Sequence, residues 1–99
     1  MLTNNMRPIH PGEILREELQ ELGCSARELA RALGVPVNRV TGILREERSI
    51  TADTALRLAR YFTSTPEFWL NLQSAYDLRQ TQRAVGKKIV RAVRPRAVA

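Results

Sequence analysis

The chain has 99 residues, of which 43% are hydrophobic and 26% charged, with a formal net charge of +6. This length predicts one domain with a modest core and excludes a deep catalytic cavity with its own scaffold. No apolar run reaches the roughly 18 residues that cross a bilayer, the N-terminus has no signal-peptide stretch, and Cys24 is the single cysteine. We therefore expect a cytoplasmic protein without an internal disulfide, a cofactor or a membrane partner.

The positive charge is confined to the end of the chain. Residues 1–82 contain ten Lys+Arg and ten Asp+Glu, whereas residues 83–99 contain six Lys+Arg and no acid, which gives the whole net charge of +6. Overall basicity is therefore weak evidence for a nucleic-acid surface on the folded body. Such a surface has to be inferred from the local arrangement of residues.

The N-terminal part predicts an irregular arm over residues 1–10, followed by a first helix. Pro8 cannot lie inside a helix, whereas Pro11 is tolerated in a first turn, so the helix is expected to begin there. Gly23 ends it. The apolar residues at helical spacing, expected to face the core, are Ile14, Leu15, Leu19 and Leu22.

Residues 25–45 predict two short helices joined by a tight turn. Ser25 and Glu28 have the spacing of a capping box, Gly34 can take the left-handed conformation of the turn, and Pro36 suits the start of the next helix. The inward residues of this pair are expected to be Leu29, Ala30, Leu33, Val35, Val40, Ile43 and Leu44. This is the pattern of a helix-turn-helix, whose second helix lies in the major groove of DNA.

Two further helices and a basic tail complete the chain. Thr51 caps a fourth helix and Thr65 a fifth, which has Pro66 in its first turn and is expected to end near Arg83. The inward set of the fourth helix is Ala55, Leu56, Leu58, Ala59 and Phe62. Residues 84–99 form a basic tail, whose stretch 87–94 is either a frayed helix or disordered. Five helices without a credible strand predict an all-α fold, with residues 11–83 as the DNA-binding domain and its dimerisation helix.

The polar face of the third predicted helix is the candidate reading surface. Asn38 can form two hydrogen bonds to adenine, Val37 can contact a thymine methyl, and Thr41 can do either. Arginines can reach base edges or phosphates, and the amide groups at the start of the second helix attract phosphate. The full set of candidate DNA-binding residues is Ser25, Arg27, Pro36, Val37, Asn38, Arg39, Thr41, Gly42, Arg45 and Arg48.

The alternative is an ordinary helical hairpin whose exposed residues only face solvent, as in a pure interaction module. Two details favour DNA binding: the exposed face of the third helix has no acid before Glu46, and the acids gather on the first helix.

An enzyme is poorly supported. His10 and Cys24 have no histidine or cysteine partner for a metal site or nucleophile pair, and the stacked Glu17 and Glu21 are typical of a solvated face.

The fifth predicted helix is more apolar than one face requires. A module this small is expected to bind DNA as a homodimer, which presents two reading helices about one helical turn, roughly 34 Å, apart on an inverted repeat. The candidate dimerisation residues are Phe68, Trp69, Leu72 and Tyr76. Completion of the monomer core is the alternative for each of them.

Three segments resemble one known family. Residues 8–15 (PIHPGEIL), 50–59 (ITADTALRLA) and 68–73 (FWLNLQ), together with the helix-turn-helix, are similar to HigA-type antitoxins of the phage-repressor-like (XRE) helix-turn-helix family, over about residues 7–80. The helix-turn-helix marks the broad family, whereas the first and last segments are narrower. The resemblance implies a five-helix phage-repressor-like domain. It places the base-reading positions at Val37, Asn38, Thr41 and Gly42 and a phosphate contact at Arg45.

The resemblance also implies two activities and two bacterial partners. Such an antitoxin neutralises a HigB-type toxin, an mRNA endonuclease, and represses its own operon by binding operator DNA as a dimer, which would associate it with the nucleoid. A stand-alone repressor without a toxin is the alternative.

Relatives commonly have a glycine in the loop after the third helix, where this chain has Glu46, Glu47 and Arg48. The tail after Arg83 matches no family pattern; its charge suggests a phosphate-tracking arm, a toxin-binding segment or a solvated end.

Overall fold

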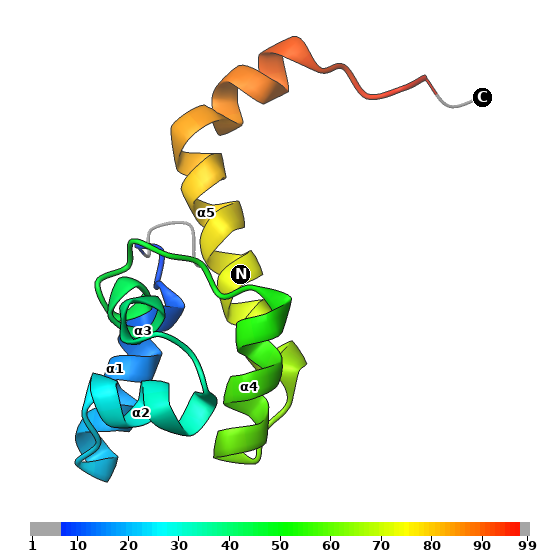
Figure 1. The fold of residues 1–99 in the computed structure, drawn as a ribbon. Coiled ribbons are helices and arrows are strands. Elements are labelled where there is room, and N and C mark those ends of the chain that lie inside the picture. The colour runs from blue at the N-terminus through cyan, green and yellow to red at the C-terminus, as the bar shows by residue number, and fades with distance from the viewer. Residues whose placement is uncertain (1–6, 98–99) are drawn as a thin grey trace.

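A computed structural model describes residues 7–97, and within this range the chain forms five α-helices and no strand (Figure 1). The helices are α1 (Pro11–Leu22), α2 (Ala26–Leu33), α3 (Val37–Leu44), α4 (Ala52–Phe62) and α5 (Pro66–Ala92). The all-α prediction is confirmed. Of the expected N-terminal arm, residues 7–10 are non-helical and residues 1–6 lie outside the described range. No helix in the described part of the chain combines the length and the apolar character needed to cross a membrane.

Local side-chain chemistry fixes the ends of the short helices. Ser25 and Glu28 form the predicted capping box: the Ser25 hydroxyl accepts from the Glu28 amide at 3.1 Å, and the Glu28 carboxylate accepts from the Ser25 amide at 2.8 Å. Thr51 caps α4 in the same way, through the amide three residues later. Gly23 and Gly34 end α1 and α2 in the left-handed region, with φ of 65° and 73°. The sequence signals therefore gave these bounds correctly.

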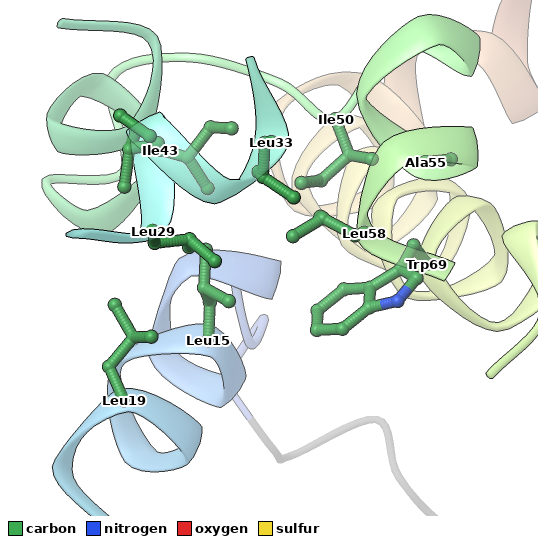
Figure 2. Packing of buried hydrophobic residues seen from close by; sticks show 11 residues of the cluster. Leu15, Leu19, Leu29, Leu33, Ile43, Ile50, Ala55, Leu58 and Trp69 are labelled. Atoms are coloured by element: carbon green, nitrogen blue, oxygen red, sulfur yellow. The ribbon is translucent and has the colours of Figure 1, made fainter. Parts of the chain in front are cut away.

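One hydrophobic core joins all five helices, and Trp69 is its largest member (Figure 2). The Trp69 side chain is 2% exposed, and its indole N–H donates to the Ser64 hydroxyl at 3.2 Å. Two residues expected to face this core, Leu22 and Leu56, are exposed instead. Leu22 is the last residue of α1, and Leu56 lies on the outer side of α4. The buried cluster is Leu15, Leu19, Leu29, Ala30, Leu33, Val40, Ile43, Ile50, Ala55, Leu58 and Trp69.

A buried glutamine ties the loop before α4 to α5. The Gln73 side chain accepts a hydrogen bond from the Ile50 amide at 2.7 Å through Oε1, and its Nε2 donates to Asp77 at 2.9 Å. Because an unpaired buried amide is costly, both ends of Gln73 need these partners. Gln73, the buried polar member of the 68–73 segment, therefore has a structural role that its apolar neighbours do not provide.

His10 caps α1 and contacts α5. Its Nδ1 accepts from the Gly12 amide at 2.9 Å, and its ring packs edge-on against Tyr76, with the ring centroids 4.8 Å apart. The residue is 3% exposed, and this burial lowers the pKa of His10 below its ordinary value. The negative charges of Glu46, Asp77 and Glu13 raise the pKa of His10 and act against the effect of burial. The positive charge of Arg16 lowers this pKa, as burial does.

The folded protein is therefore expected to lose stability as the pH falls through the ordinary histidine pKa of about 6.5. The unfolded chain takes up the proton first, because the neutral ring is favoured in the fold and an Nδ1 that carries a proton cannot accept the Gly12 amide. His10→Asn keeps a capping oxygen without titrating, so its unfolding midpoint in urea should be less dependent on pH between about pH 7.5 and 5. An equal pH dependence in both proteins would contradict this assignment.

Helix α5 is longer than expected. It continues past the predicted end near Arg83, through Gly86, to Ala92, so the domain boundary placed at residue 84 falls inside a helix. In Figure 1 the second half of α5 curves and leads away from the other four helices. The residues from Lys87 to Ala92 are all exposed, in agreement with this arrangement. The sequence signal for a stop at Arg83 was weak, because one glycine costs a helix only about 1 kcal/mol.

Candidate DNA interface

The turn between α2 and α3 is held from α4. Gly34 makes the turn, and the Arg57 guanidinium donates to the last carbonyl of α2, that of Leu33, at 2.8 Å. A side chain at position 34 would meet this guanidinium at 3.5 Å and would require the left-handed conformation. Arg57 thus satisfies a carbonyl that the end of a helix leaves unpaired.

Helix α3 has one buried and one open side. Val40 and Ile43 are buried in the core, as predicted, whereas Pro36 and Asn38 are exposed. Val37 is 37% exposed at the start of the helix. The remaining candidates on this helix, Arg39, Thr41 and Gly42, are half-buried. No acid occurs between the first and last residues of α3. The helix itself therefore offers amide, hydroxyl and methyl groups and contributes no carboxylate to its open side.

Arg39 is held from the first turn of α4. Its Nη1 donates to Asp53 Oδ2 at 2.5 Å, and the same carboxylate oxygen accepts from Arg57 Nε at 2.9 Å. The hydrogen bond from Arg57, and to a smaller extent the one from Arg39, holds the pKa of Asp53 below its usual value. This role of Asp53 was not predicted from the sequence. The spacing of four residues between Asp53 and Arg57 places both on one helix face and is a signal for that pair, whereas the contact with Arg39 has no local signal.

The start of α2 is exposed and carries two more candidates. The Ser25 hydroxyl oxygen caps the helix, which leaves the hydroxyl proton available to an acceptor outside the helix. Arg27 is exposed in the first turn. The placement of both residues fits an approach of phosphate to the amino end of this helix.

The loop after α3 bends without a glycine. Glu46 takes the left-handed conformation at φ 63°, and its carboxylate lies 3.6 Å from Arg16 Nη2 of α1. The same guanidinium donates to the Leu44 carbonyl. The Glu46 carboxylate is therefore partnered by α1, and Glu46 itself makes the bend of a loop that has no glycine.

The last two candidates flank this bend. Arg45 is exposed and ends α3. Arg48 is also exposed, and its aliphatic stem packs over Gly42, where an added Cβ would lie 3.3 Å from Arg48 Cβ. Gly42 therefore provides room for Arg48, and its place among the base-reading positions that the resemblance implies stays a prediction.

The four candidate dimerisation residues are not equivalent. Trp69 is buried in the core, so we correct its assignment: it stabilises the protomer and cannot present its ring to a second copy. Leu72 is half-buried against the same core, and Tyr76 packs on His10. Phe68 is 45% exposed. The apolar residues of α5 with a larger exposed fraction than Phe68 lie further along the helix, at Leu78, Ile89 and Val90.

The helices α2 and α3 are short and are joined by a glycine turn, and α3 is supported on its apolar side and open on its polar side. This arrangement defines a helix-turn-helix domain. Comparison with known proteins agrees, since the helix-turn-helix family matches residues 15–69. A HigA-family addiction module antidote protein from Coxiella burnetii is 62% identical, with a TM-score of 0.90, over 92% of this chain and 100% of that one.

Two further relatives are similar over most of their length. The antitoxin HigA of Pseudomonas aeruginosa, solved with the higBA promoter, is 51% identical, with a TM-score of 0.89, over 92% of this chain and 100% of that one. Antitoxin HigA-1 of Vibrio cholerae is 40% identical over 83 residues, which cover 83% of this chain and 78% of the relative. The chain belongs to the HigA-type antitoxins of the helix-turn-helix family, which are regulators and not enzymes.

Proposed function

We propose that the protein represses its own operon by sequence-specific binding to operator DNA through the open side of α3. The observation that carries this proposal is the acid-free exposed face of α3, on a chain whose relatives include one solved with its promoter. Asn38 is the base-reading residue best placed on this face, because it is exposed in the first turn and can both donate and accept. Arg45, Arg48 and the start of α2 supply phosphate contacts that set the register.

The proposal includes a dimer formed through the second half of α5. Here residues recur at alternating intervals of three and four, the spacing of a two-stranded coiled coil. This seam consists of Ala75, Leu78, Gln82, Val85, Ile89 and Ala92. Leu78 is 60% and Ile89 47% exposed in the single protomer, and both line a hollow on the curved helix together with Gly86. The basic residues Arg83, Lys87 and Arg91 lie outside the three-and-four repeat, although they line the same hollow.

The second part of the proposal is neutralisation of a HigB-type toxin. It is supported by the family alone, and a stand-alone repressor is the competing function. If the toxin acts as a co-repressor, it must dock away from α3, because both contacts are needed at once. Co-expression with a small neighbouring reading frame, followed by co-purification, tests this part. A complex that forms but cannot hold operator DNA would contradict docking away from α3.

Asn38→Ala is expected to weaken operator binding by roughly 1–3 kcal/mol and to leave binding to random DNA nearly unchanged. The reason is that a bidentate base contact exists only at the correct base, whereas phosphate contacts exist everywhere. Fluorescence anisotropy with operator and random duplexes of equal length measures both affinities.

Asn71→Ala is the matched control, because Asn71 is an exposed asparagine on α5. It should change neither affinity. Equal losses on operator and random DNA for the Asn38 variant would show that α3 does not read bases. If the unaltered protein bound its own promoter no more tightly than random DNA, the proposal that it is a repressor would be refuted.

A further inference from the structure

Asp53 connects three parts of the helix-turn-helix region. Its Oδ2 accepts from Arg39 of α3 at 2.5 Å and from Arg57 of α4 at 2.9 Å. Arg57 in turn donates to the Leu33 carbonyl at the end of α2. Because Arg57 is fixed at two points, the carboxylate between the arginines has a defined place. Asp53 is also ionised at neutral pH, since both arginines lower its pKa.

This contact restrains an arginine beside the proposed reading residue. Arg39 follows Asn38 in α3, and only its Nη1 has an acceptor within residues 7–97. Its other N–H groups remain available to DNA, and its side chain is 30% exposed. A free arginine would bind any phosphate within reach and would lose side-chain entropy on doing so. An arginine already held in one place gives up less freedom and contacts DNA only where the duplex fits.

We propose that Asp53 is a positioning residue for specificity: it holds Arg39 in the orientation used at the operator and lowers the attraction of Arg39 for DNA in general. This inference rests on the proposed function of α3 as the reading helix. It assigns a carboxylate to a DNA interface, where a negative charge alone would only weaken binding. The measurable consequence is an effect on the ratio of operator to random affinity, because loss of a charge by itself changes both affinities alike.

Asp53→Asn is expected to raise the affinity for random DNA and to lower the ratio of operator to random affinity by about fivefold, the effect of a modest mismatch. Arg39→Gln is also expected to lower this ratio, while the Asp53–Arg57 pair stays intact. In the Arg39→Gln background, Asp53→Asn should leave the ratio unchanged. This double-mutant cycle isolates the part of the effect that passes through Arg39.

Glu67→Gln is the matched control for charge. Glu67 is an exposed acid in the first turn of α5, as Asp53 is in the first turn of α4. It should leave the ratio unchanged. The proposal is overturned if Asp53→Asn has the same ratio of operator to random affinity as the unaltered protein. It is also overturned if Asp53→Asn lowers this ratio by the same factor in the Arg39→Gln background as in the unaltered protein. Should Asp53→Asn not fold, as judged by circular dichroism, an Arg39→Gln protein with an unaltered ratio overturns it as well. Absence of any operator preference in the unaltered protein would instead refute the proposed function.

Discussion

Ile89→Asp is expected to convert the protein to a monomer and to lower its operator affinity by about 100-fold, the advantage that two linked contacts give over one. Ile89 is the fifth of the six seam residues of α5 and is 47% exposed in the single protomer. A carboxylate at this position would have to be buried without a partner when two seams meet, and this desolvation is costly. The protomer itself should keep its stability, because α5 contributes to the core through Trp69, well before Ile89.

The control for this variant introduces the same charge off the seam. Ala84 is exposed on α5, five residues before Ile89, and does not belong to the three-and-four repeat. Ala84→Asp should therefore remain dimeric in analytical ultracentrifugation and should keep its operator affinity to within a few-fold. If Ile89→Asp sediments as a dimer, or if both variants dissociate alike, the copies meet through another surface. Phe68 would then be the next candidate.

Gly12→Ala is expected to destabilise the fold by about 2–3 kcal/mol, the cost of overfilling a well-packed site. A Cβ at residue 12 would lie 2.0 Å from the carbonyl oxygen of Ile43 and 3.0 Å from its carbonyl carbon. Both obstacles are backbone atoms, so α1 and α3 must move apart. Such a loss is large for a domain whose total stability is about 5–15 kcal/mol. Because α3 would shift, operator binding should fall even at temperatures where the variant is folded.

Gly86→Ala provides the comparison, since the nearest atom to its added Cβ, Gln82 Cβ, lies at 3.8 Å. Alanine in an open helical position should stabilise α5 by about 0.5–1 kcal/mol. Urea unfolding followed by circular dichroism measures both variants. A Gly12→Ala protein as stable as the original would mean that α1 and α3 are not in the close contact described above.

Signals within a few residues predicted much of this fold. Ser25 with Glu28, and the glycines at 23 and 34, fix helix ends through bonds to their immediate neighbours, so their sequence spacing was sufficient. The apolar spacing of α3 identified Val40 and Ile43 as buried, because this short helix has a single supported side. The exposed side of α3 followed from the same spacing.

Contacts between distant segments could not be predicted in this way. Trp69 was a reasonable candidate for a dimer surface until the packing of all five helices placed it in the core. Neither the pairing of Asp53 with Arg39 nor the pairing of Glu46 with Arg16 follows from local spacing. Both depend on how segments far apart in the sequence lie against each other. The continuation of α5 beyond Arg83 was missed because a glycine weakens a helix without ending it.

The central claim is that α3 reads base identity, and a base-by-base scan of the operator tests it most directly. Each position of one half-site is replaced by the other three bases, and the affinities of the unaltered protein and of Asn38→Ala are compared. The account predicts that Asn38→Ala loses its preference at one or two adjacent positions and keeps it at all others. If the variant keeps the full base preference at every position, α3 does not read the sequence and the account is wrong.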